Sequence, residues 1–185
     1  MRNSITPLPG GRLRKEYRGT LAWKREITLL RQMAGSGLCP ELLDAPPREA
    51  EMTECPGVPL GECIRTAYRQ EAREMMAALA AWTDAFEREY HRRTGQTAVL
   101  EDLSPGNFLW DAASRKITGL DFEFWHTGSP AEDRGGLLCM AERLKAAEIT
   151  GEELTGELYR QFRGGSDRAE LEHRAARARQ QTALR

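Results

Sequence analysis

The chain has 185 residues, of which 40% are apolar and 30% charged, a composition that is typical of a folded globular protein and excludes an intrinsically disordered one. Its 27 Lys and Arg residues nearly balance its 28 Asp and Glu residues, so the overall charge gives no support to a nucleic-acid partner or to a polybasic membrane contact. No apolar run has the length of a membrane span or of a secretory signal, and we therefore expect a reduced, cytoplasmic protein.

The first part of the chain has the pattern of a small sheet with one helix. Prolines and a Gly-Gly pair mark residues 1–11 as irregular, whereas the alternation that follows is typical of a strand with Leu13, Lys15 and Tyr17 on one face. Thr20 is a candidate cap for the helix after this strand. The expected elements are an irregular arm at 1–11, a strand at 12–18, a helix from Thr20 to about Met33, and short strands at 39–44 and 51–54.

The rest of the chain has mostly helical patterns around one short hairpin. Apolar side chains recur at helical spacing from Met75 to Phe86, which predicts a helix that faces the core. Ser-Pro-Ala-Glu at 129–132 and Thr-Gly-Glu-Glu at 150–153 are capping boxes that predict two further helix starts. The expected elements are a helix over about 62–94 with a bend near Gln70, a strand and loop at 99–111, a strand at 116–124, helices after 129 and 150, and a terminal helix from Ser166 after a break at Gly164-Gly165.

The four cysteines give no indication of a disulfide framework or a zinc site. They form no Cys-x-x-Cys pair and have no histidine at metal-ligand spacing. We interpret Cys39, Cys63 and Cys139 as structural thiols in or near apolar segments.

The clearest chemical pattern is Leu100-Glu-Asp-Leu-Ser-Pro-Gly-Asn107, followed after a short predicted hairpin by Ile117-Thr-Gly-Leu-Asp-Phe-Glu123. Any one of its polar residues alone is more often a turn former or a strand-end cap. Their order and context favour a site instead, because the Pro-Gly turn lets Asp102 and Asn107 face the same side. Mg²⁺ prefers hard oxygen ligands and keeps several waters, so one carboxylate and one amide on neighbouring loops suffice to hold it.

This segment resembles the catalytic loop of protein-kinase-like phosphotransferases, in which His-x-Asp-Leu-x-Pro-x-Asn precedes a hairpin and an apolar-Asp-Phe strand end. The resemblance includes aminoglycoside phosphotransferases, small atypical kinases and kinases of lipopolysaccharide-core sugars, and it extends over roughly residues 12–145. It implies an α+β fold with two lobes. We expect a reduced N-lobe of sheet and helix at 1–55 and a mostly helical C-lobe at 56–185 with the catalytic loop and a metal-binding hairpin, which together form one kinase-like domain.

The resemblance also implies ATP and Mg²⁺ as cofactors. In this interpretation Asp102 accepts a hydrogen bond from the hydroxyl of the acceptor and orients it. Asn107 and Asp121 hold the metal, and Asp121 bridges it to the phosphates. Phosphoryl transfer needs little covalent help from the protein, so residues that neutralise charge and hold the nucleophile in line are sufficient.

Other residues fit the same resemblance. Lys15 would face the phosphates and pair with Glu26 of the following helix, although Glu26 could also be a solvated helix charge. Backbone groups around Glu54 and Cys55 would meet the adenine. Asp133 stands where such proteins have a buried Asp that braces the catalytic loop, and its alternative role is to complement the dipole at a helix start.

Two features depart from the family pattern. The histidine of the catalytic loop is replaced by Leu100, which removes a structural brace but no reacting group. The residues ahead of Lys15 are too few for two strands and a turn, so a full Gly-rich hairpin over the phosphates does not fit. The pair Gly10-Gly11 is either a plain turn or a source of backbone N–H groups for a phosphate.

The expected activity is an ATP- and Mg²⁺-dependent transfer to a hydroxyl. Asp133 follows only 12 positions after Asp121, which leaves no room for a long activation loop and favours a small-molecule or sugar acceptor. The main alternative is a catalytically silent, pseudokinase-like scaffold with a protein partner that covers the open N-lobe. A further alternative is an unrelated α+β protein in which the motif is accidental.

Overall fold

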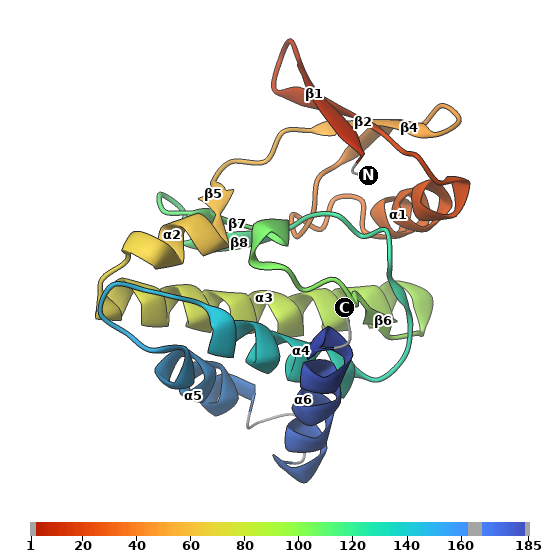
Figure 1. The fold of residues 1–185 in the computed structure, drawn as a ribbon. Coiled ribbons are helices and arrows are strands. Elements are labelled where there is room, and N and C mark those ends of the chain that lie inside the picture. Colours follow the sequence, from red (N-terminus) through yellow and green to blue (C-terminus); the bar gives the residue numbers. More distant parts are fainter. Residues whose placement is uncertain (1–2, 163–167, 184–185) are drawn as a thin grey trace.

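The N-terminal lobe is an antiparallel sheet of four strands with one helix beside it (Figure 1). The computed structural model describes residues 3–162 and 168–183, so the expected break at Gly164-Gly165 and the helix start at Ser166 lie outside the described residues. The strand order is β1-β2-β4-β3. The elements of this lobe are β1 (Ser4–Leu8), β2 (Arg12–Glu16), α1 (Thr20–Gln32), β3 (Leu42–Asp44) and β4 (Glu49–Thr53).

The prediction of an irregular arm at 1–11 is wrong, because residues 4–8 pair with β2 as a regular strand. Both Gly10 and Gly11 have left-handed φ angles, 79° and 66°, which glycine adopts without steric cost and which close this hairpin tightly. The turn lies beside the connector to the second lobe, since the Gly11 carbonyl accepts the Glu54 N–H at 2.8 Å. A single strand therefore precedes β2 in the described part of the chain, where a complete hairpin over the phosphates would need two.

The C-terminal lobe is mostly helical and carries a short hairpin on its upper side (Figure 1). Its long helix α3 (Arg69–Thr94) runs under the hairpin. The remaining elements are β5 (Val58–Pro59), α2 (Leu60–Thr66), β6 (Ala98–Val99), the 3₁₀ turn η1 (Pro105–Asn107), β7 (Phe108–Asp111), β8 (Lys116–Gly119), β9 (His126–Thr127), α4 (Pro130–Arg143), α5 (Gly151–Phe162) and α6 (Arg168–Ala183).

An aromatic stripe on α3 holds the hairpin and the segment after it. The predicted core positions from Met75 to Phe86 are buried, which confirms the helical pattern. The Trp82 ring lies 5.3 Å from Phe108 of β7, and the Phe86 ring stacks at 5.7 Å on Phe122, the neighbour of Asp121. The packing of α3 on Phe122 thus helps to fix the position of Asp121, the candidate metal ligand.

Several element boundaries differ from the predictions. The helix expected over 62–94 begins at Leu60 and is broken at Ala67 and Tyr68. The strand expected to reach 124 ends at Gly119, because the chain turns at Asp121 with a left-handed φ of 60°. Thr20 is the first residue of α1 rather than its cap, which is Gly19.

Both predicted capping boxes are confirmed. Ser129 and Glu132 close the start of α4, and Thr150 and Glu153 do the same for α5. The division at 55/56 is our proposed boundary between the lobes, since β4 ends at Thr53 whereas β5 already pairs with β7. Among the described helices, none combines the length and the apolar character that a membrane crossing requires.

Candidate active site

Lys15 is buried, and its charge is met by a carboxylate from α1. Strand alternation turns Lys15 to the inner side of β2, where it is 5% exposed. Its Nζ lies 2.6 Å from Oε2 of Glu26, which is 2% exposed on α1. A buried ammonium is costly unless it is paired, so the predicted ion pair is present where the physics requires one.

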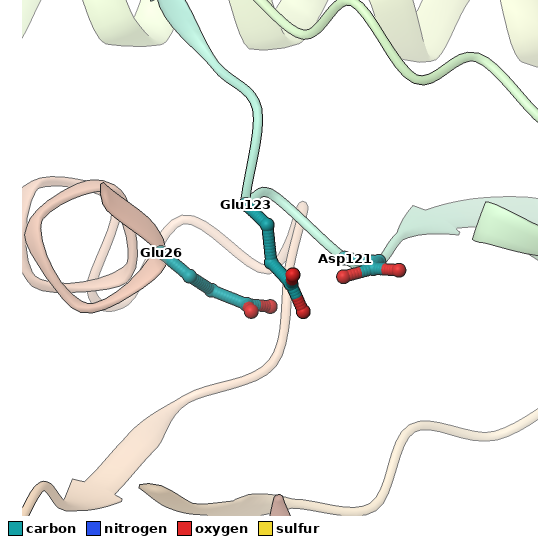
Figure 2. Close-up of side chains that lie close together, drawn as sticks. All are labelled: Glu26, Asp121 and Glu123. Carbon is teal, nitrogen blue, oxygen red and sulfur yellow. The ribbon is translucent and has the colours of Figure 1, made fainter. Parts of the chain in front are cut away.

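Two further carboxylates come from the C-terminal lobe. Lys15 Nζ lies 2.7 Å from Asp121 Oδ1 and 2.8 Å from Glu123 Oε1. Figure 2 shows the three acidic side chains converging, and one oxygen of each lies within 4.8 Å of the others. Burial alone would lower the pKa of Lys15, but the charges of Glu26 and Asp121 raise it above its usual value. Lys15 therefore remains an ammonium and joins the two lobes.

The segment after β8 places Asp121 by backbone contacts. The Leu120 N–H donates to the carbonyl of Asn107 at 2.8 Å, which ties this segment to the end of the catalytic loop. The Phe122 N–H donates to Oε1 of Glu26 at 3.3 Å. Asp121 stands between these two anchors, and its side chain is 38% exposed and open to a ligand.

The catalytic loop holds Asp102 and Asn107 together. The Asn107 side-chain amide donates to the Asp102 carbonyl at 3.2 Å, which leaves the amide oxygen directed away from that carbonyl. Asp102 Oδ1 accepts the Ser104 N–H at 3.2 Å, so the carboxylate has a defined direction. The structure thus gathers Asp102 and Asn107 in one loop, and the backbone bond from Leu120 brings that loop next to Asp121.

Asp133 braces the catalytic loop from below. It is 3% exposed at the start of α4, and both of its oxygens accept the Leu100 N–H, at 2.9 and 3.0 Å. Burial raises the pKa of Asp133 to about 7. The hydrogen bonds from the backbone of Leu100 and Glu101 lower this pKa but do not cancel the effect of burial. The bracing contact predicted from the sequence is therefore present.

Glu54 and Cys55 lie in the connector and do not join the carboxylate cluster. Glu54 is exposed and Cys55 is half-buried. The Glu54 N–H already donates to the Gly11 carbonyl at 2.8 Å. The backbone groups that remain for the predicted contact with adenine are therefore the Glu54 carbonyl and those of Cys55. Their role stays a prediction.

Sequence reasoning assigned no role to Glu123, which is 8% exposed and contacts Lys15. The motif held no local signal for this contact, because the chain turns at Asp121 with a φ of 60° and the alternation of an extended strand does not continue to Glu123. Glu123 also accepts a hydrogen bond from the Asn3 amide at the start of β1. Burial raises the pKa of Glu123, and Lys15 opposes this shift.

Apolar side chains lie on the same face of the sheet as Lys15. Ile5 stands directly opposite Lys15, and Leu13 stands opposite Met52, so these side chains share that face. Ile5 is 62% exposed although it lies on this mostly apolar side. We call this surface the Lys15 face.

A cavity of about 230 Å³ lies next to the catalytic loop. Its lining includes both chain neighbours of Asp102 and is rich in acidic groups. His126 stands beside Glu101, with Nε2 3.8 Å from Oε2. The lining residues are Val99, Glu101, Leu103, His126, Glu132, Asp133 and Gly136.

A second buried charge group lies behind Asp133. Arg134 Nη2 lies 2.8 Å from Glu87 Oε2 and 2.9 Å from Asp84 Oδ1, both on α3. Oε1 of Glu87 is buried without a hydrogen-bond partner among the described residues. Burial raises the pKa of Glu87 to about 7, and Arg134 only partly offsets this effect.

Comparison with solved structures shows the fold of protein-kinase-like phosphotransferases. The gentamicin complex of APH(2")-IIa matches with a TM-score of 0.69 at 10% identity, over 94% of this chain and 77% of the other. The ADP-bound aminoglycoside phosphotransferase APH(2'')-Ib matches with 0.63 at 11% identity, over 94% and 81%. A choline/ethanolamine kinase family protein from Mesorhizobium loti matches with 0.67 at 16% identity, over 92% and 69%. No family model and no curated protein matches the sequence.

We predict that Glu87 makes the free energy of unfolding fall as the pH rises from about 4.5 to about 7. In this interval the folded protein keeps a proton that the unfolded chain has released, so the contribution is complete below the unfolded pKa and is lost as the pH passes the folded pKa. Glu87→Gln should reduce the decrease in Tm between pH 5 and pH 8. The exposed Glu152→Gln should leave it unchanged, and parallel curves for Glu87→Gln and the wild type would contradict the assignment.

Proposed function

We propose that the protein transfers the γ-phosphoryl group of ATP, with Mg²⁺, to a hydroxyl of a small molecule or a sugar. The contact between Lys15 of one lobe and Asp121 of the other, at 2.7 Å, carries this proposal. Phosphoryl transfer needs a cation for the phosphate oxygens and a carboxylate for the metal on the same side, with a base nearby for the acceptor. A kinase-like fold that gathers these groups supports a phosphotransferase more strongly than the fold alone.

The donor set fits Mg²⁺. Asp121 is partly exposed, the amide group of Asn107 uses its nitrogen and not its oxygen in the bond to Asp102, and Glu123 offers a third hard oxygen. When bound, the metal nucleotide supplies the phosphoryl group and charge neutralisation. The cluster of three carboxylates around one ammonium has an excess of negative charge, so we expect nucleotide binding to depend on the metal.

Each residue of the chain then has a separate task. Lys15 exchanges carboxylate contacts for phosphate oxygens, and Glu26 limits how far it moves. Asp102 accepts the hydrogen bond of the acceptor hydroxyl and takes up its proton. The apolar Lys15 face, with Ile5 and Leu13, would cover the adenine, whose edge would meet backbone groups at Glu54 and Cys55. A cytoplasmic location would supply the ATP and keep the cysteines reduced.

The acidic cavity beside Asp102 is our proposed acceptor site. The structural neighbours include complexes with gentamicin and with streptomycin and a choline/ethanolamine kinase family protein, and all of these compounds carry both amino or ammonium groups and hydroxyls. Glu101 and Glu132 line the cavity here, and carboxylates in such a position favour a cationic group on the acceptor. We therefore propose an amine-bearing hydroxyl compound as the acceptor.

Binding of ATP should depend on Mg²⁺ and on Asp121. A site occupied at a hundred times its Kd stabilises the folded protein by about 2.7 kcal/mol, so a clear rise in Tm is expected with ATP and Mg²⁺ together and a much smaller one with EDTA. Asp121→Ala should remove the effect. Absence of any shift at millimolar ATP under both conditions would favour the silent scaffold.

Lys15, and not Lys24, should contact the phosphates. Lys24 is exposed on α1 and stands two residues from Glu26, on a different side of the helix. We expect Lys15→Met to weaken ATP binding or turnover at least tenfold, about 1.4 kcal/mol, and the matched Lys24→Met to change little. Equal losses for both variants would place the phosphates elsewhere.

Turnover should require Asp102 and should prefer amines. Asp102→Asn keeps the side-chain size and removes the accepting charge, so phosphate transfer should be lost while ATP binding remains. In an acceptor screen read by ADP formation, hydroxyl compounds with an amine should be used, and Glu101→Gln should raise KM for them more than it lowers kcat. Transfer to neutral sugars alone would contradict the proposed acceptor class.

A further inference from the structure

Tyr17 lies against Lys15 and has a hydroxyl that the site as described does not use. It is 3% exposed and stands two residues after Lys15, so it faces the same side of the sheet. Lys15 Nζ lies 5.0 Å from the centroid of its ring. Arg48 fixes the backbone here, because its carbonyl accepts the Tyr17 N–H at 2.8 Å and its Nε donates to the Tyr17 carbonyl at 3.3 Å. The ring is therefore a fixed support for the ammonium.

The hydroxyl of Tyr17 is buried without a hydrogen-bond partner in the described part of the chain. Such a group is costly, and it indicates a partner in another state of the site. Burial raises the pKa of Tyr17, and the charge of Glu26 together with a polar contact to this carboxylate raises it further. The hydroxyl therefore lies close to Glu26, although it does not form a hydrogen bond of regular geometry with it.

Glu26 is the carboxylate that would need this hydroxyl. Its Oε1 accepts the Phe122 N–H at 3.3 Å, and its Oε2 accepts the ammonium of Lys15 at 2.6 Å, whereas the Tyr17 hydroxyl lies close by without a regular hydrogen bond. If Lys15 turns toward phosphates, Oε2 loses its donor while it remains buried at 2% exposure. A buried carboxylate oxygen without a donor is strongly unfavourable.

We propose that Tyr17 is a positioning residue whose hydroxyl donates to Glu26 when Lys15 moves its ammonium to the phosphates of the nucleotide. The exchange keeps Glu26 ionised and directed at Lys15, and the ring limits the path of the ammonium. The inference rests on the proposed function, because only a phosphate ligand draws Lys15 away.

Tyr17→Phe tests the exchange because it keeps the ring and removes only the hydroxyl. The Tm of the nucleotide-free protein should stay the same or rise, since an unpartnered buried group is removed. The affinity for ATP with Mg²⁺, measured by calorimetry on the full chain, should fall by about five- to tenfold. If the hydroxyl had only a structural role, its removal would not leave the Tm unchanged or higher and at the same time lower the affinity for ATP.

The matched control is Tyr90→Phe, because the Tyr90 hydroxyl is paired with Gln32 at 3.0 Å, away from the cluster. It should lower the Tm and leave the affinity unchanged. In a Glu26→Gln background, Tyr17→Phe should cost much less affinity than in the wild type. If the wild type binds ATP with Mg²⁺ and Tyr17→Phe binds equally well, the inference is wrong and the proposed function stands. If the wild type does not bind, both are overturned.

Discussion

A buried ammonium must be surrounded by anions, and Lys15 draws its three carboxylates from both lobes. Glu26 belongs to α1, whereas Asp121 and Glu123 belong to the segment after β8. The Lys15 charge therefore fixes the orientation of the sheet relative to the helical lobe. A second contact joins the same two segments, because Trp125 Nε1 donates a hydrogen bond to the carbonyl of Arg25 on α1 at 2.6 Å. Removing the ammonium would therefore disturb both the contact between the lobes and the positions of Asp121 and Glu123.

The rest of the site is positioned by helices that carry no reacting group. The aromatic stripe of α3 supports β7 and Phe122, and hence Asp121. The start of α4 supports the catalytic loop through Asp133, and Arg134 ties α4 back to α3. The two helices α3 and α4 thus support the segment that carries Asp121 and the loop that carries Asp102. This arrangement suits a reaction in which the protein contributes position and charge rather than covalent chemistry.

Local patterns predicted the parts of the fold that depend on local physics. Capping boxes, the stripe of α3 and the inward direction of Lys15 follow from spacing along the chain, and the structure contains them. The strand β1 was missed because its order comes from pairing with β2 and not from its own prolines and small residues. The contact of Lys15 with Asp121 joins residues 106 positions apart and was not predicted, because the family resemblance paired Lys15 with Glu26. Glu123 was missed for the same reason.

At Leu100, where the family pattern has a histidine, the contact that braces the loop is made by the backbone. Asp133 accepts the N–H of Leu100, a group that every residue except proline supplies. The side chain of Leu100 is then free to pack in the core, where it is 6% exposed. The identity at this position therefore matters less to the loop than the burial of Asp133. Asp121 differs in this respect, because its contact with Lys15 is made by the side-chain carboxylate and not by the backbone.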